Sequence, residues 1–180
     1  MKITLITLAI LSAIILAVWA YFDGFRKIKI TVAEQGGETV VYESITGDYR
    51  QSGAVMDKVY YTLLNDYKIE TYKGFGQYYD NPKLVDKTKL RSEAGCIIEP
   101  KDVQKLVQID IPFRVKTIPV KKYMITEFPY KGKLSVMFGI FKVYPALEKF
   151  TMQNNHSIDG SIIEIYDVPG KKIMYRKEIE

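Results

Sequence analysis

Cysteine and histidine are almost absent from this chain, with one of each among its 180 residues. The lone Cys96 excludes an internal disulfide framework and a multi-cysteine metal site. A zinc site, or a nucleophilic pair made by Cys96 and His156, is also disfavoured. The sequence has no GxSxG motif, no phosphate-binding GxxxxGK[ST] loop and no evident Ser-His-Asp triad. We therefore expect no metal and no cofactor.

Blocks of basic residues interleaved with aromatic residues are also missing. The formal net charge is +5, from 26 basic and 21 acidic residues, and the basic residues are dispersed. A nucleic-acid partner would need a concentrated basic stripe. The sequence thus predicts no nucleic-acid partner.

The N-terminal segment is present as one long apolar run. Residues 3–22 carry no charge, and a helix of that length spans roughly 30 Å, the thickness of the hydrocarbon layer of a membrane. Trp19, Tyr21 and Phe22 lie at its end, where aromatic side chains favour the membrane interface. We expect residues 1–24 to be a single-pass transmembrane anchor. A cleaved signal peptide is the alternative, although its apolar core is usually shorter.

Basic residues on the two sides of this run predict its orientation. Arg26, Lys27 and Lys29 follow the run, whereas only Lys2 and the terminal amine precede it. Because cytoplasmic flanks are enriched in Lys and Arg, we expect the rest of the chain to lie in the cytoplasm.

Hydrophobic periodicity predicts an α+β domain after the anchor. Strands are expected at 39–45, 75–79, 90–98, 122–128, 161–166 and 172–176, with a short strand or stalk at 27–33 and an extended piece at 113–118. Helices are expected at 52–67, 102–108 and 133–141. Pro145 lacks an N–H and clashes with the preceding helical turn. We therefore expect a break near Tyr144, with Pro145 opening a further helix that runs to about Gln153.

The order strand, helix, strand, strand occurs twice, which predicts a duplication. Tyr42 matches Tyr123 and Tyr49 matches Tyr130 at one constant spacing, and residues 79–82 match 166–169 at a slightly larger one. We expect residues 25–37 to be a stalk and residues 38–180 to form one domain. Half-repeats at about 38–98 and 121–178 would form an antiparallel sheet with a central cleft, and such junctions are favoured ligand sites.

Several motifs, in this order, resemble the GyrI-like, AraC-type effector-binding (SOUL-like) domains. They are TGDY at 46–49, YYDNP at 78–82 with the strand from Leu90 to Ile98, TEFPY at 126–130, VYPALEKF at 143–150 and IIEIYD at 162–167. The likeness extends over residues 38–178. It is strongest to a membrane-anchored animal member of the family that serves as a receptor for autophagy of the endoplasmic reticulum. It implies a small-molecule-binding domain that is more a binder than an enzyme.

Two roles known in that family are not expected here. No helix-turn-helix region is present, so the resemblance does not imply a transcription regulator. No long tail with an autophagy-receptor motif is present either. The fold, the anchor and the ligand cleft are what the resemblance implies for this chain.

Glu164 is the first candidate for the ligand site. Alternation along a strand places Ile162, Glu164 and Tyr166 on one face. Residues alone leave Glu164 either a solvated edge charge or the anionic floor of a pocket. The resemblance favours the pocket, because the corresponding glutamate in the family commonly meets cationic or polar groups of the effector. Tyr166 is a further ligand-binding candidate, and those that would form an aromatic wall are Tyr42, Tyr49, Phe75, Tyr78 and Tyr130.

Three functions are compatible with these features. The first is a membrane-held module that binds an amphipathic or cationic small molecule beside Glu164. The second is a hydrolase of strained electrophilic molecules with Glu164 as general base, which the resemblance allows because some GyrI-like proteins resemble hydrolases. The third is an adaptor that binds a protein partner.

Overall fold

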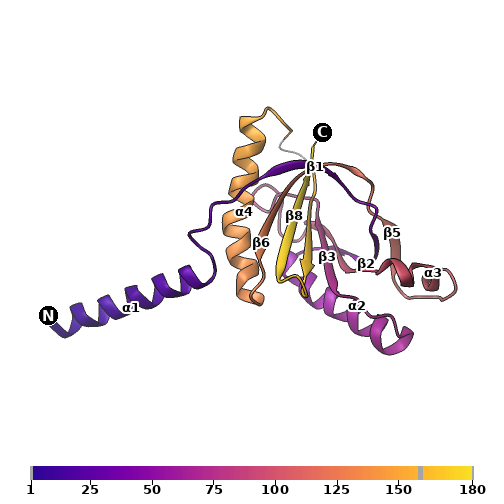
Figure 1. The fold of residues 1–180 in the computed structure, drawn as a ribbon, viewed down its shortest axis with the longest axis horizontal. Coiled ribbons are helices and arrows are strands. Elements are labelled where there is room, and N and C mark those ends of the chain that lie inside the picture. Colours follow the sequence, from indigo (N-terminus) through magenta and orange to yellow (C-terminus); the bar gives the residue numbers. More distant parts are fainter. Residues whose placement is uncertain (1, 158–159, 180) are drawn as a thin grey trace.

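An eight-stranded antiparallel sheet forms the centre of the chain, and two long helices cover one of its faces (Figure 1). The computed structural model describes residues 2–157 and 160–179. The helices are α1 (Lys2–Tyr21), α2 (Ser52–Tyr67), α3 (Val103–Leu106) and α4 (Lys133–Gln153), with 3₁₀ turns at Tyr49–Gln51 and Pro100–Asp102. The strands are β1 (Thr31–Gln35), β2 (Thr39–Thr46), β3 (Lys73–Tyr78), β4 (Arg91–Ile97), β5 (Arg114–Thr117), β6 (Lys121–Pro129), β7 (Ile162–Asp167) and β8 (Lys172–Glu178).

The sheet confirms the predicted duplication. Its order is β1-β6-β8-β7-β3-β4-β2-β5, so both halves have the same order outward from the central pair: β3, β4, β2 on one side and β7, β8, β6 on the other. Each half also contributes one long helix at the same place along the chain: α2 lies between β2 and β3, and α4 lies between β6 and β7. An approximate twofold axis therefore passes between β3 and β7, where Gly76 is paired with Glu164.

One detail of the predicted repeat is wrong. The hydroxyl of Tyr79 lies 3.5 Å from Lys116 Nζ on one face of the sheet, whereas Tyr166 donates to Glu164 on the other. Tyr79 and Tyr166 are therefore not equivalent. Because side chains alternate along a strand, Tyr78 is the residue of β3 that shares the face of Tyr166.

α4 corrects a second expectation, because it runs unbroken from Lys133 to Gln153 with Pro145 inside it. Proline removes the hydrogen bond to the carbonyl four residues earlier, here that of Phe141. Pro145 and Phe141 are both exposed, so water can hydrate that carbonyl and the helix continues. The segment 27–33, for which a short strand or a stalk was expected, overlaps β1, which pairs with β6 and is an edge strand of the sheet.

The face of the sheet away from α2 and α4 is enclosed by the sheet itself. The backbone N–H of Gly37 donates to the carbonyl of Ile118 at 2.7 Å, and Ile118 N–H donates to Glu38 at 2.9 Å. These bonds join the link between β1 and β2 to the link between β5 and β6, which brings the two edges of the sheet together. The enclosed cluster consists of Val40, Tyr42, Phe75, Ile97, Ile118, Tyr123, Ile163 and Ile165. Burial of this apolar surface stabilises the curl.

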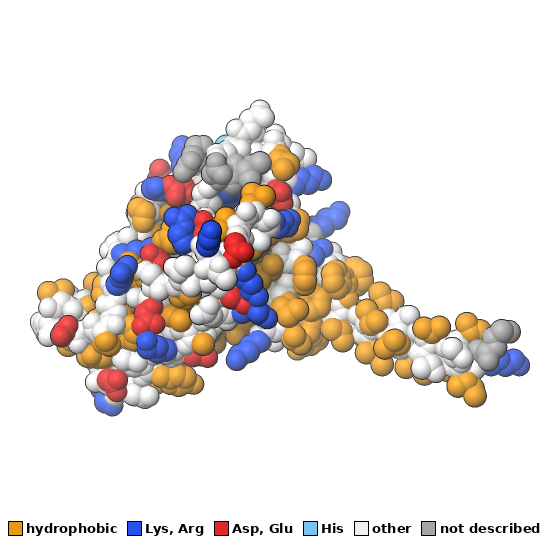
Figure 2. Space-filling model, turned by 180° about the vertical axis from the view of Figure 1, so that it is seen from behind, with side chains coloured by type: hydrophobic (Ala, Val, Ile, Leu, Met, Phe, Trp, Pro, Cys, Tyr) orange, Lys and Arg blue, Asp and Glu red, His pale blue; other side chains and the backbone are white. Residues whose placement is uncertain are grey.

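α1 projects from the rest of the molecule (Figure 1), and apolar side chains cover its length (Figure 2). None of its residues is buried, and its mean hydropathy of 2.6 suits a membrane span, although a signal sequence has the same character. Its end is fixed to α4: the ring of Phe22 stacks on Phe138 at 4.9 Å and Trp19 meets the same ring edge-on. Lys131 donates to the carbonyl of Tyr21 at 2.6 Å.

Candidate functional site: an acidic cavity between the two halves

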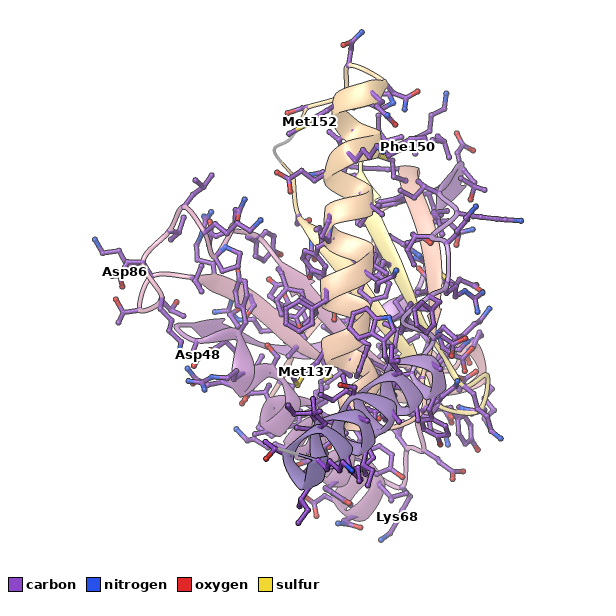
Figure 3. All side chains as sticks on the ribbon, turned by 90° about the vertical axis from the view of Figure 1, so that its left-hand side faces the viewer. Asp48, Lys68, Asp86, Met137, Phe150 and Met152 are labelled. Carbon is purple, nitrogen blue, oxygen red and sulfur yellow. The ribbon has the colours of Figure 1, made fainter. Side chains whose placement is uncertain are left out.

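A cavity of about 1500 Å³ lies between α2 and α4, above the central strands β3 and β7. The twofold plan creates this space, because each helix packs over the outer strands of its own half. Gly74 of β3 lines the floor, where a side chain would meet Met56 and Tyr166. Figure 3 shows side chains gathered between α4 and the neighbouring strands. This volume exceeds that of a typical ligand pocket.

Glu164 lies on the floor of this cavity with a side chain that is 1% exposed. The sequence prediction that Ile162, Glu164 and Tyr166 share one face is met, since all three line the cavity. The hydroxyl of Tyr144 donates to Glu164 Oε1 at 2.8 Å, and that of Tyr166 donates to Oε2. Among residues 2–157 and 160–179, no Lys or Arg forms an ion pair with this carboxylate.

Burial controls the protonation of this site. Desolvation raises the pKa of Glu164, and the hydrogen bonds from Tyr166 and Tyr144 oppose that rise. Desolvation, together with the charge of Glu164, also raises the pKa of Tyr144 and Tyr166 well above the ordinary value. Both tyrosines therefore remain hydrogen-bond donors, and within the described residues the hydrogen-bond partners of Glu164 are these two neutral hydroxyls.

Four predicted tyrosines form two equivalent ring pairs around the acid. The ring centroids of Tyr49 and Tyr78 lie 4.9 Å apart in the first half, and those of Tyr130 and Tyr166 lie 6.4 Å apart in the second. All four residues line the cavity. The hydroxyl of Tyr49 is fixed at the rim by a 2.8 Å bond to the carbonyl of Asp80. The cavity thus has aromatic walls on both sides of Glu164.

Tyr42 and Phe75, which were also predicted to line the site, do not. Both belong to the enclosed cluster on the opposite face of the sheet. Their rings instead face Lys116, whose Nζ lies 4.9 Å from the Tyr42 centroid and 5.5 Å from that of Phe75. Phe75 has the wrong parity on β3, because residues 74, 76 and 78 face the cavity. The prediction for Phe75 is therefore wrong by one residue along β3, which is enough to place its side chain on the opposite face.

Tyr144 and Tyr175 lie next to Glu164 but were not among the predicted site residues, and of the two only Tyr144 lines the cavity. Tyr144 was placed at a helix break, whereas continuous α4 holds it above Glu164. Tyr175 on β8 is paired directly with Glu164 on β7, and its buried hydroxyl has no hydrogen-bond partner within the described part of the chain. Alternation along the predicted final strand was the signal that could have identified Tyr175.

The described residues contain no group of three or more His, Cys, Asp and Glu side chains that could hold a metal ion. Burial raises the pKa of Cys96 to about 11, so this thiol is not a nucleophile at neutral pH. Arg91 forms an ion pair with Asp80, with 2.7 Å between Arg91 Nη2 and Asp80 Oδ1.

Several solved structures have the same fold as this chain. EcmrR in its DNA complex matches with a TM-score of 0.61 and 11% sequence identity, and the match covers 95% of this chain and 65% of EcmrR. The EcmrR C-terminal domain alone matches with a TM-score of 0.57 and 10% identity, and the match covers 85% of this chain and 98% of that domain. SAV2435 bound to tetraphenylphosphonium has 0.53 at 10%, covering 84% and 94%. A hydrolase from Listeria innocua has 0.50 at 13%, covering 86% and 93%.

The fold is that of the GyrI-like effector-binding domains. The sequence resemblance implied this fold, and the order of the sheet agrees with it. The chain spans 65% of the EcmrR chain in the DNA complex. No protein-family model and no curated protein sequence matches this chain.

Proposed function

We propose that this chain is a membrane-attached module that binds an amphipathic organic cation in the cavity between its two halves. The observation that carries the proposal is Glu164, a fully buried carboxylate whose partners within the described residues are two neutral tyrosine hydroxyls. A buried charge without an opposite charge is unfavourable. A ligand cation beside Glu164 would supply the missing opposite charge, and this pairing would contribute to the free energy of ligand binding.

The walls of the cavity suit the rest of such a ligand. Aromatic rings attract a desolvated cation with about 2 kcal/mol, and the ring pairs of Tyr49 with Tyr78 and Tyr130 with Tyr166 flank the acid. Met56 and Met137 add flexible apolar surface, and Ile140 adds further apolar surface. A bulky lipophilic cation matches this combination, and SAV2435, which shares the fold, was solved with tetraphenylphosphonium.

Attachment to the membrane is the second part of the proposal. α1 has the length and hydropathy of a span and no buried residue. Arg26, Lys27 and Lys29 follow it, which favours a cytoplasmic position for the ligand-binding domain. In this proposal the partners are the small-molecule ligand and the membrane, without nucleic acid.

The test is binding of tetraphenylphosphonium to the full chain in lipid nanodiscs, measured by titration calorimetry. Removing one partner of a buried charge pair costs at least about 2 kcal/mol, so Glu164→Gln should weaken binding by roughly 30-fold or more. The matched control is Glu127→Gln, because Glu127 is an exposed glutamate paired with Lys172. Equal affinity in wild type and Glu164→Gln would refute the role of the acid.

Protein stability separates a binding defect from a folding defect. A carboxylate with a raised pKa contributes stability that is fully present below its unfolded pKa and is lost as the pH rises through its folded pKa. At neutral pH, Glu164→Gln should therefore leave the melting temperature unchanged or raise it. A marked decrease would instead assign Glu164 a structural role.

Hydrolysis is the second candidate, favoured by the same buried carboxylate and by the fold shared with the Listeria innocua hydrolase. Glu164 would act as general base toward water, since burial raises its pKa toward neutrality. Turnover of a strained cyclopropane electrophile that is lost in Glu164→Gln would support this function. Stoichiometric binding without turnover would reject it.

A further inference from the structure

The first half of α4 exposes an apolar stripe to solvent. Leu134, Met137 and Phe141 are 55%, 53% and 66% exposed, and exposed Pro145 extends the line. Their spacing of three and four residues places them on one side of the helix, over a length of roughly 16 Å at 1.5 Å per residue. Contiguous exposed apolar side chains usually mark an interaction surface.

The position of this stripe next to α1 indicates what covers it. Phe138, in the same half of α4, packs against Trp19 and Phe22 at the end of α1. Lys131 also holds Asp23 and the carbonyl of Tyr21. The start of α4 is therefore fixed at the level where the apolar run of α1 ends.

The direction of α4 fits a surface lying across α1. Figure 1 shows α4 crossing the direction of α1 rather than following it. Figure 3 views the molecule from the side toward which α1 projects, and α4 lies at the front of that face with Met137 near its lower end. If α1 crosses a bilayer, α4 thus lies along the bilayer surface, which is the orientation of an interfacial amphipathic helix.

Charged and aromatic residues around the junction have the character of a membrane interface. Arg26, Lys27 and Lys133 are exposed within a few residues of the contact between α1 and α4, and basic residues near a membrane attract anionic lipid headgroups by about 1 kcal/mol each. Phe25, which is 66% exposed, lies in the turn that follows the end of α1 at Tyr21. These features favour a lipid surface over a folded protein as the occupant of the stripe.

The stripe is also part of the cavity wall. Met137, Phe141 and Pro145 belong to it and line the cavity that contains Glu164. We propose that the Leu134–Pro145 stripe of α4 lies in the surface of the bilayer that α1 crosses, so that the cavity opens onto lipid. This inference rests on the membrane attachment proposed above. It narrows the ligand class to amphiphiles that partition into the interfacial layer and expose their cationic group to Glu164.

The test is fluorescence quenching by brominated lipids, with the full chain in nanodiscs. The only native tryptophan is removed by Trp19→Phe, and single tryptophans are then introduced as Leu134→Trp or Phe141→Trp. Both should be quenched several-fold more strongly by lipids brominated near the headgroup than Val107→Trp, because Val107 is 87% exposed and follows α3, at the end of the molecule far from α1 (Figure 1).

Ile10→Trp, in the middle of α1, separates the two ways in which the test can fail. Quenching at position 10 by deeply brominated lipid, with positions 134 and 141 no more quenched than position 107, would overturn the surface contact and leave the anchor intact. Absence of quenching at position 10 would overturn the membrane attachment and the contact with it. Circular dichroism confirms folding, and two stripe positions guard against a local defect in one of them.

Discussion

β3 and β7 occupy equivalent places beside the twofold axis, yet they bring different chemistry to the cavity. At the axis, Glu164 of β7 is paired with its counterpart Gly76 of β3. The glycine leaves space and the acid supplies charge. The duplicated plan therefore creates the cavity, whereas divergence of one half creates its chemistry.

Two arginine ion pairs of the sheet differ in burial. Arg176 on β8 is 2% exposed and pairs with Glu38 through both terminal nitrogens. Arg91 on β4 pairs with Asp80 at the surface. One of these ion pairs is therefore buried, whereas the other lies at the surface in contact with water.

The largest expected effect sharpens this contrast between the two ion pairs. Glu38→Ala leaves Arg176 buried without its carboxylate, and such a loss costs about 3 kcal/mol. Arg91→Ala removes a water-screened pair and should change stability far less. Chemical denaturation of both variants measures the difference, and equal destabilisation would show that burial does not distinguish them.

The second prediction compares α2 with α4, because each of these helices carries one glycine, and the space beside the two glycines differs. A Cβ on Gly139 of α4 would lie 2.2 Å from the hydroxyl of buried Tyr175, whereas a Cβ on Gly53 of α2 has nothing within 4 Å. Overpacking should make Gly139→Ala destabilising by about 2 kcal/mol. Gly53→Ala should stabilise by up to ~1 kcal/mol through helix propensity.

A double variant checks the cause of this difference. Adding Tyr175→Phe to Gly139→Ala removes the hydroxyl and should recover much of the lost melting temperature. No recovery would mean that the cost does not come from the contact between Gly139 and Tyr175.

The smallest expected effect compares Tyr166 with its counterpart Tyr78. Tyr166→Phe removes a hydrogen bond that lowers the pKa of Glu164, so this pKa should rise further. Tetraphenylphosphonium keeps its charge at all pH values and needs ionised Glu164. As the pH is lowered, the Tyr166→Phe variant should therefore lose tetraphenylphosphonium binding at a higher pH than the wild-type protein does.

Tyr78→Phe is the matched control, because the Tyr78 hydroxyl forms no hydrogen bond with Glu164. Titration calorimetry across pH measures the midpoint of binding for each variant. A Tyr78→Phe midpoint that moves as far as that of Tyr166→Phe would contradict the specific role of the Tyr166 hydroxyl.

Local patterns predicted most elements because they depend on nearby residues. α2 has the bounds expected from its apolar spacing, and six core strands lie within a few residues of their predicted places. Pro145 was misinterpreted because the tolerance of α4 for proline depends on solvent beside Phe141, which the sequence does not show. Phe75 was misplaced because a shift of one residue in a strand reverses the face.

The sequence by itself determined the apolar run of α1, the twofold order of elements and the face of Glu164, because each follows from the periodicity or length of a continuous segment. Only the tertiary structure decided that Tyr144 covers this acid, that Tyr42 and Phe75 serve the opposite face, and that α4 lies against the base of α1. Those facts depend on how distant segments pack, and packing is fixed by the whole chain rather than by any one of its segments.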